Sequence, residues 1–369
     1  MKVPQIFDRN MKRLAFLDNA VSVGYSLEIN SLWTATFTLP ADDDKNAYCQ
    51  PLNFVEIFDG DERIDLFRII GEDLERSNGA TRFYDCEHVL ATLLSDVLFQ
   101  YHQYGGGGIK TADVLNYVLA RQTTRNWVLG DCDFKRYFEY NWENSTLLAA
   151  LFAVPECFDS EYMWTWDTTV YPWTISLVAP SDTMKSEVRY AKNMTSMKKT
   201  VDASGIANRI YALGYGEGVN QLTIAGVNGG KPYVEDAMSI QQYGLCSTIL
   251  VDSRYEVAEN LKGYAEQMLA ELKNPYVSYE IGAIDLHRLT GDTFSKFRPG
   301  EIVRVVDEAD GINLRTRIVS VEKSDAQGDP GSVTVTIANK SKDIAGSISE
   351  LQNRALINET YAQGATNQQ

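Results

Sequence analysis

The sequence predicts a β-rich α+β protein with two similar β-barrel domains, an α/β domain between them and a short C-terminal helix. Three observations predict it: strand-like alternation towards both ends of the chain, helical periods in the middle, and a weak internal repeat. Because a single core stops growing near ~250 residues, a chain of 369 residues is expected to form several domains. The expected divisions are 1–90 for the first barrel, 91–195 for the α+β domain, 196–340 for the second barrel with a helical insertion near 254–274, and 341–369 for a C-terminal helix or linker.

The N-terminal strands are predicted by the alternation of apolar residues with smaller or polar ones. Val23 and Tyr25 begin the first such run, and a second run follows after a short turn. Half-buried strands show this period of two because successive side chains point to opposite faces of the sheet. Two further strands, over 54–58 and 64–70, flank an acidic turn that contains glycine, so a hairpin is expected there.

Helical spacing replaces this alternation from residue 89 onward. Apolar residues recur every three or four positions over 89–99, 111–119 and 257–272, which is the spacing of one helix face. Pro275 explains where the last of these helices ends. The remaining expected elements are a helix over 145–152, an aromatic hairpin over 162–178, and strands over 207–213, 221–227, 276–284, 301–306, 314–322 and 332–338.

Two hairpins far apart in the chain resemble each other in sequence. The matching stretches are Val55-Glu56-Ile57-Phe58-Asp59 with Val303-Arg304-Val305-Val306-Asp307, and Arg68-Ile69-Ile70 with Arg317-Ile318-Val319. The two matches lie at nearly the same distance from each other in both copies. A chance match between two hairpins is one explanation, and a true duplication, which would give two similar barrels, is the other.

The C-terminal tail is expected to form a helix that contacts other subunits. Its apolar residues fall at alternating steps of four and three, the spacing of a coiled-coil seam, over a shorter length than the ~3 heptads that define such a seam well. The predicted trimer seam consists of Ile344, Ile348, Leu351 and Ala355.

Composition narrows the classes of partner. A net charge of −16 argues against stable binding of duplex DNA, because affinity for phosphates comes mainly from Lys and Arg. Residues 1–13 lack the apolar core of a signal peptide, and no apolar run reaches the ~18 residues of a membrane span. We therefore expect no membrane anchor and synthesis in the cytoplasm. Five scattered cysteines are expected to be reduced and to behave as small apolar residues.

No catalytic, cofactor-binding or metal-binding set is predicted. The glycines of 214–218 precede an expected strand instead of the helix that a dinucleotide loop needs, and the run 105–111 lacks the Gly-Lys order of a phosphate loop. Cys86, Glu87 and His88 are adjacent on a strand, where neighbouring side chains diverge instead of converging on one ion. Carboxylates of a hydrolase site carry no sequence signature, so such a site stays open as an alternative.

Aromatic residues are concentrated in the expected hairpin over 162–178. Stacked rings of this kind bind sugars, whereas packing across strands or between subunits is the more common role of large aromatic residues. The candidate residues for sugar binding or for a subunit interface are Tyr162, Trp164, Trp166 and Trp173.

Several stretches together carry a resemblance to a known family. They are 20–40, Phe54-Val55-Glu56-Ile57, Leu66-Phe67-Arg68-Ile69-Ile70, Tyr84-Asp85-Cys86-Glu87-His88-Val89-Leu90, Ala207-Asn208-Arg209-Ile210-Tyr211-Ala212-Leu213-Gly214, Leu222-Thr223-Ile224 and Tyr233-Val234-Glu235-Asp236. In these stretches the chain resembles the baseplate-hub proteins of bacteriophage tail tips, including the N-terminal hub region of siphophage tail-associated lysins of the prophage endopeptidase tail family. None of the stretches is a catalytic motif, so the resemblance concerns a scaffold.

The resemblance implies a homotrimer in which six related β-barrels give pseudo-sixfold symmetry. Such a hub joins the sixfold tail tube to threefold distal parts of the tail tip, in the virion, and leaves a channel for DNA. Strands near 54–70 and 303–319 are expected to line this ring, with acidic residues that repel DNA in transit. The implied partners are distal tail or tail-tube proteins, the tape-measure protein, and receptor-binding or fibre proteins.

Two other functions stay open from the sequence. Many relatives carry a peptidoglycan hydrolase after the hub, so a cell-wall-degrading peptidase or muramidase is one alternative. Because this chain ends soon after the predicted seam, we expect a structural protein and no enzyme. A carbohydrate-binding tail module that uses the hairpin aromatics is the other alternative.

Overall fold

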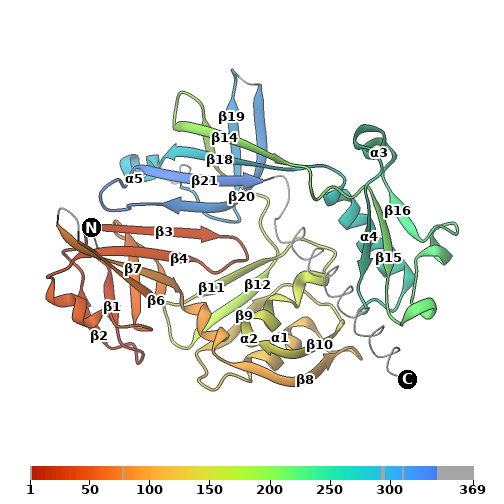
Figure 1. Cartoon of the computed structure of the whole chain (residues 1–369), viewed down its shortest axis with the longest axis horizontal. Coiled ribbons are helices and arrows are strands. Elements are labelled where there is room, and N and C mark those ends of the chain that lie inside the picture. Colours follow the sequence, from red (N-terminus) through yellow and green to blue (C-terminus); the bar gives the residue numbers. More distant parts are fainter. Residues whose placement is uncertain (1, 77–78, 292–295, 310, 339–369) are drawn as a thin grey trace.

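The largest element of the fold is a thirteen-stranded sheet that combines strands from both ends of the chain (Figure 1). The computed structural model describes residues 2–76, 79–291, 296–309 and 311–338. The sheet consists of β1 (Gln5–Phe7), β2 (Arg13–Phe16), β3 (Ser22–Glu28), β4 (Thr34–Pro40), β5 (Phe54–Asp59), β6 (Glu62–Arg76), β7 (Ala80–His88), β13 (Met184–Arg189), β14 (Met194–Asp202), β18 (Tyr276–Ile284), β19 (Ile302–Asp307), β20 (Ile312–Lys323) and β21 (Ser332–Ala338). Short helices lie beside it, η1 (Asp44–Tyr48) and α5 (Leu286–Thr290). Among the described strands the sheet stays open, and no closed barrel is formed.

An α+β region is inserted between the two sets of strands. Its strands are β8 (Val97–Gly105), β9 (Trp127–Cys132), β10 (Glu139–Thr146), β11 (Met163–Asp167) and β12 (Trp173–Val178). Its helices are η2 (Val89–Leu94), α1 (Thr111–Leu119), α2 (Leu147–Phe152) and η3 (Pro155–Cys157). β8 and β10 form a separate two-stranded ribbon, and β12 lies between β11 and β9. The expected aromatic hairpin is therefore β11 and β12.

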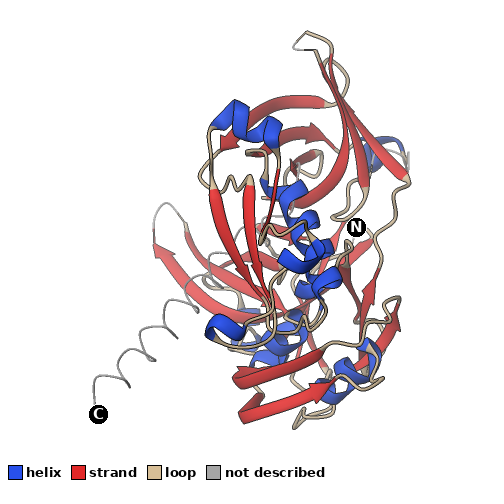
Figure 2. Ribbon diagram, turned by 90° about the vertical axis from the view of Figure 1, so that its right-hand side faces the viewer, coloured by secondary structure: helices blue, strands red, loops and turns tan. Residues whose placement is uncertain are grey.

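A second insertion forms the lobe at the right of Figure 1. It contains β15 (Arg209–Leu213), β16 (Tyr233–Glu235) and β17 (Ser247–Val251), with β15 in the centre. The helical elements are η4 (Gly218–Asn220), η5 (Ala225–Val227), α3 (Ala237–Tyr243) and α4 (Ala258–Leu272). α4 has helical spacing of its buried residues, as the sequence predicts, and ends just before Pro275. Figure 2 shows that strands, drawn in red, make up most of the regular structure.

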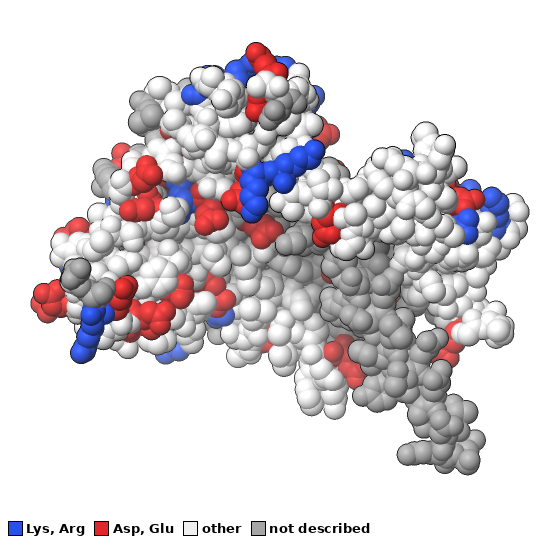
Figure 3. All heavy atoms as spheres, turned by 45° about the horizontal axis from the view of Figure 1, so that its top comes forward, with Lys and Arg blue, Asp and Glu red and all other residues white. Residues whose placement is uncertain are grey.

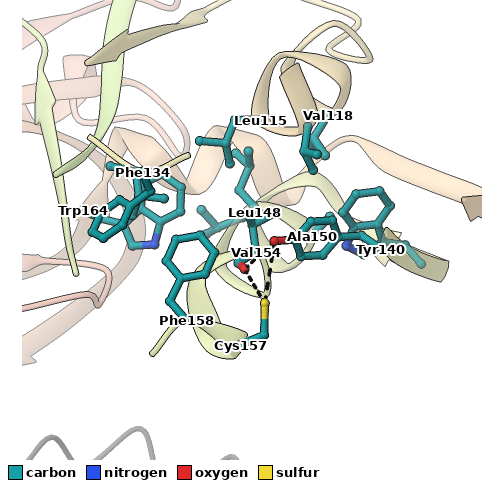
Figure 4. Packing of buried hydrophobic residues seen from close by; sticks show 14 of the residues in the cluster. Leu115, Val118, Phe134, Tyr140, Leu148, Ala150, Val154, Cys157, Phe158 and Trp164 are labelled. Atoms are coloured by element: carbon teal, nitrogen blue, oxygen red, sulfur yellow. Dashed lines mark hydrogen bonds between the residues drawn. The ribbon is translucent and has the colours of Figure 1, made fainter. Parts of the chain in front are cut away.

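Three hydrophobic cores hold these parts together. One core lies among the N-terminal strands and includes Phe37, Phe67 and Tyr84. A separate core lies among the C-terminal strands and is rich in valine and isoleucine. The third and largest core joins the α+β region to the lobe, and part of it is seen in Figure 4 around Phe158 and Leu148. Each half of the long sheet therefore has a core of its own.

Two predicted elements are wrong. The helix expected over 89–99 is a short 3₁₀ turn, η2, followed by strand β8. Val97 and Phe99 are exposed whereas Leu98 is buried, which is the alternation of a strand. The strand expected over 221–227 consists of turns, and only an isolated bridge joins Thr223 to Leu213. Its apolar residues are packed against the core without a ladder, so burial alone explains why they are apolar.

Candidate functional site

The long sheet contains the same arrangement of strands twice. In the N-terminal unit, neighbours follow the order β3, β4, β7, β6, β5 and β1. In the C-terminal unit, they follow the order β14, β18, β21, β20, β19 and β13. The weak sequence repeat falls on corresponding hairpins, β5–β6 and β19–β20. The units differ at one edge, where β1 runs antiparallel to β5 but β13 runs parallel to β19.

The corresponding hairpins agree residue by residue. In β5 and in β19 only the third residue, Glu56 or Arg304, is partly exposed, and the other five are buried. An arginine of the second strand lies opposite the first residue of each hairpin in both units. Both second strands carry a register shift directly after the same isoleucine, Ile69 in β6 and Ile318 in β20. This agreement in burial, register and irregularity favours a duplicated unit over a chance match.

The two units are joined edge to edge by β20 and β3. The pairing is antiparallel, with Val321 opposite Leu27 and Lys323 opposite Tyr25. At the end of this ladder the Lys323 ammonium lies 2.7 Å from a carboxylate oxygen of Asp59 and 2.7 Å from one of Asp285. It also donates to the carbonyl of Pro330, at 2.9 Å. A cation of the C-terminal unit is thus held by a carboxylate of the N-terminal unit.

This ionic cluster is almost completely removed from solvent, with Lys323 only 2% exposed. The Tyr25 hydroxyl donates to Asp59 at 3.0 Å, and burial, together with the nearby Asp59 charge, raises the pKa of Tyr25 well above its ordinary value. Burying an ammonium group costs several kcal/mol unless carboxylates and other acceptors surround it. Because one carboxylate comes from each unit, the cluster is satisfied only when the units meet in this register.

A cavity of about 470 Å³ lies beside the junction. Its walls come from β3, from the hairpin residues 163–169, and from the segment 296–299. Arg63 extends along one wall, where it contacts Glu56 and donates to the Thr168 hydroxyl at 2.9 Å. The cavity therefore lies where the α+β region meets both units, and its lining mixes polar and apolar side chains.

Asp65 in the same wall is buried and ionised. Its carboxylate lies 3.4 Å from the imidazole of His88, which is completely buried. Burial alone would raise the pKa of Asp65, but His88, Thr168 and Arg63 outweigh that effect and hold the pKa below its ordinary value. His88 also accepts a hydrogen bond from the backbone of Leu90 at 3.1 Å, which fixes the ring where β7 ends. The pair is a structural contact at the base of the α+β region.

The four aromatic residues singled out in the sequence lie in different contacts. Trp173 packs against Trp127, with ring centres 5.3 Å apart, and is buried. Trp164 is also buried and stacks on Phe152 at 5.4 Å. Trp166 packs edge-on against Trp33 at 4.7 Å, and Tyr162 lies near Phe158 at 6.4 Å. Trp164 and Trp166 line the cavity, whereas Tyr162 and Trp173 are not among its lining residues.

The remaining candidates for chemistry have structural surroundings. In the described part of the chain, no group of three or more His, Cys, Asp or Glu side chains is placed to hold a metal ion. His102 is hydrogen-bonded to the Tyr117 hydroxyl at 2.9 Å. Cys157 lies in the core next to the Val154 carbonyl and the Tyr140 hydroxyl (Figure 4), and burial raises the pKa of its thiol to about 11. All five cysteines are free thiols.

Two further predictions concern the ends and surfaces of the chain. The predicted seam of Ile344, Ile348, Leu351 and Ala355 lies outside the described residues. Across the part of the chain that the structure describes, no helix is long and apolar enough to span a membrane.

Comparison with solved structures identifies the class of protein that this duplicated sheet defines. The prophage tail protein gp18 from Listeria monocytogenes EGD-e aligns with a TM-score of 0.63 and 14% identity, over 95% of this chain and 99% of that chain. The tail protein from Neisseria meningitidis MC58 gives a TM-score of 0.64 and 10% identity, over 92% and 96%. The 43 kDa tail protein of prophage MuSo2 from Shewanella oneidensis gives 0.62 and 14%, over 93% and 98%. The fold is that of phage tail proteins.

Sequence comparison then identifies the family. The model of the prophage endopeptidase tail family matches residues 181–348, and that of the prophage endopeptidase tail domain matches residues 106–172. No curated protein matches the chain. The chain belongs to the prophage endopeptidase tail family and is a structural protein of a phage tail. The resemblance inferred from the sequence is confirmed at this level.

Proposed function

We propose that the chain is the subunit of a trimeric baseplate hub at the tail tip. The duplicated unit is the observation that carries this proposal. Three copies supply six similar units, which match a sixfold tail tube, whereas the α+β region and the lobe occur once per chain and give threefold features. One ring thus contacts both kinds of neighbour: distal tail, tail-tube and tape-measure proteins on one side, and receptor-binding or fibre proteins on the other.

A further structural neighbour supports this assignment at the level of the fold. A component of the Escherichia coli type VI secretion system, described as structurally similar to the T4 bacteriophage tail proteins gp27 and gp5, aligns with a TM-score of 0.51 and 10% identity. The match covers 88% of this chain and 74% of that chain. A scaffold shared by a secretion system and phage tails fits a role at the axis of the tail.

The face of the long sheet opposite its two cores is suited to line a channel for DNA. Along six neighbouring strands it presents mainly small hydroxyl side chains and carboxylates, with Phe83 of β7 as an aromatic exception, since the alternate positions are buried in the cores. These residues are Ser22, Ser26, Glu28, Thr34, Thr36, Thr38, Asp85, Ser320, Glu322, Thr334, Thr336, Ser278 and Glu280. Such a lining repels phosphates and offers few cations to bind them. On the face shown in Figure 3, acidic side chains are likewise spread widely and basic ones gather in a few places.

The decisive experiment is an image of the assembled tail tip. We expect density for this chain in a threefold ring around the tail axis, with the hydroxyl and carboxylate face towards the lumen. Density for the chain outside such a ring would overturn the proposal. A monomer in dilute solution would not, because neighbouring tail proteins stabilise a ring by mass action.

We also propose that the described residues act without enzymatic activity. Two of the three histidines, His88 and His102, are held in structural contacts, and the buried thiol of Cys157 is a poor nucleophile. Zymography on purified peptidoglycan tests this directly. Lysis that disappears when a single carboxylate or histidine is replaced would establish the peptidase or muramidase alternative instead.

Sugar recognition by the hairpin aromatics is the weaker alternative, because Trp164 and Trp173 are buried against other rings. Titration with cell-wall polysaccharide, followed by tryptophan fluorescence, is expected to give no change. A saturable change that is lost in a Trp166→Phe variant would favour sugar binding in the cavity.

A further inference from the structure

The β20–β3 junction has an equivalent pair of strands, one in each unit, that do not pair with each other within the chain. Within the chain, the last residues of β20 pair with β3. By the correspondence of the two units, the equivalents of these strands are the last residues of β6 and strand β14. In the described residues, Gly71–Leu74 of β6 pairs with β7, and β14 pairs with β18. Each therefore has a second edge at which a strand could be added.

We propose that the end of β6 in one copy pairs antiparallel with β14 of the next copy, repeating between copies the β20–β3 junction found within each chain. The partner is a second copy of this chain, and the inference rests on the proposed hub, whose ring it would close. It names the strands, the register and the charges that make the subunit contact.

The register follows from the pairings of the two units. Because Ile69 corresponds to Ile318, the residues Glu72 and Leu74 correspond to Val321 and Lys323. In one unit the paired residues can be followed from β6 across β7 and β4 to β3, and in the other from β20 across β21 and β18 to β14. Along these two equivalent paths, Leu27 corresponds to Val201. The expected opposite pairs between copies are Glu72 with Val201, Asp73 with Thr200, and Leu74 with Lys199.

Charges at the two edges are complementary in this register. The end of β6 carries Glu72, Asp73 and Glu75, with Arg76 as its last residue, whereas β14 carries Lys198 and Lys199, with Asp202 as its last residue. In this register Arg76 falls opposite Met197 and Asp202 opposite Gly71, so neither lies directly opposite a like charge. Continuing the ladder by one residue places Glu75 opposite Lys198, and Glu72 lies diagonal to Lys199 on the other face. Opposite charges across neighbouring strands stabilise a pairing, and like charges oppose the alternative in which two copies of β14 meet.

Apolar residues agree with the same register. Leu74 is 43% exposed and Val201 is 56% exposed, and both are large apolar side chains near the C-terminal ends of their strands. In the expected pairing they are diagonal neighbours on one face and cover each other from solvent. An exposed strand edge with such residues is otherwise prone to uncontrolled pairing.

The contact is heterologous, because the surface given by one copy differs from the surface it receives. Heterologous contacts make closed rings when the rotation between copies closes and open filaments when it does not. Since each chain already contains one junction, every added copy contributes one internal and one external junction to the ring.

Cysteine pairs test the register directly in the full chain at high protein concentration. Asp73→Cys and Thr200→Cys lie opposite each other, and opposite Cα atoms ~4.5 to 5.5 Å apart are within disulfide range. Under mild oxidation the double variant should give covalent oligomers up to a closed ring. Each single variant alone should form no covalent oligomers, and an equimolar mixture of the two should form covalent dimers and nothing larger. The out-of-register pair Asp73→Cys with Ser196→Cys is the matched control and should not link.

Charge reversal tests the energetics without a covalent bond. Lys198→Glu with Lys199→Glu should weaken self-association by about 100-fold, since like charges facing each other cost several kcal/mol. Adding Asp73→Lys and Glu75→Lys to the same chain should restore most of that loss. Circular dichroism of the variants, whose changed side chains are exposed, serves as the folding control.

The outcomes separate the pairing from the hub. If neither the in-register nor the out-of-register cysteine pair forms a disulfide at high protein concentration, the proposed pairing is overturned. A threefold ring in tail images, formed by the Asp73→Cys and Thr200→Cys double variant without a covalent link between its copies, would also overturn the pairing while leaving the hub intact. In-register links that build open filaments instead of rings would confirm the pairing and contradict the hub.

Discussion

Removing the Lys323 ammonium group should loosen the junction between the two units. In Lys323→Met the side chain keeps its length and apolar stem, but Asp59 and Asp285 lose the cation that lies 2.7 Å from each of them. Leaving a buried charge without its partner typically costs about 3 to 5 kcal/mol. Because two carboxylates from different units are affected, we expect the upper part of this range. At about 2 to 4 °C per kcal/mol for a cooperative block of the size of the two joined units together, the first melting transition should fall by roughly 10 °C or more.

Differential scanning calorimetry measures this transition, and hydrogen exchange locates it. Amides of β3 and of the end of β20 should exchange faster in Lys323→Met, whereas amides of α4 should not change. Lys262→Met is the matched control, because Lys262 forms an exposed pair with Glu266 at 3.6 Å on α4 and such pairs are worth about 0.5 kcal/mol or less. A loss in Lys323→Met no larger than in Lys262→Met would refute the role given to the cluster.

Three other predictions concern neighbouring contacts. The folded-state pKa of Asp65 lies below its ordinary value, so its charge adds stability above about pH 4 that is lost as the pH falls towards the folded pKa. Asp65→Asn should therefore flatten the pH dependence of the melting temperature below about pH 4, and an unchanged acid slope would contradict this assignment. Arg254→Met should cost about 3 kcal/mol, because Asp252 loses a partner at 2.8 Å and the lobe loses a hydrogen bond to the Ala153 carbonyl. Amide hydrogen exchange should then become faster in α2 but not in β4. Asn30→Ala removes the bonds to the Tyr162 carbonyl and the Trp164 amide, at 3.2 and 2.8 Å, and should cost about 1 to 3 kcal/mol and expose the Trp164 amide to exchange. Protection at that amide equal to the wild-type value would argue against this bridge.

The hairpins and the long helix could be predicted because their signals are local. The apolar runs of β5 and β6 around an acidic turn, the matching residues in β19 and β20, and the helical spacing before Pro275 each need fewer than about twenty residues to be recognised. The same reasoning is wrong at Val97–Gly105, where a run of adjacent apolar residues fits either period and only the tertiary exposure of Phe99 decides.

The junction could not be predicted, because its partners are distant in the chain. Lys323 and Asp59 are 264 residues apart, and each resembles an ordinary charged residue at the end of a strand. The aromatic candidates illustrate a similar limit: their spacing places Trp164 and Trp166 on one face, but the rings that cover them, Phe152 and Trp33, come from other parts of the chain. Local patterns therefore predict the strands, whereas contacts between residues distant in the chain decide how the two units meet.

The distance between β3 and β20 also sets an order of events during synthesis. At typical rates of ~5 to 20 residues per second, the ribosome needs about 15 to 60 seconds to make β20 after β3 has been completed. During that interval the N-terminal strands have a hydrophobic core of their own but an uncovered edge at Ser22–Glu28. In a polysome, the first β20 to arrive at this edge can come from a neighbouring nascent chain, which would give exchanged dimers. A host chaperone that shields strand edges should therefore raise the yield of correctly assembled protein when expression is fast.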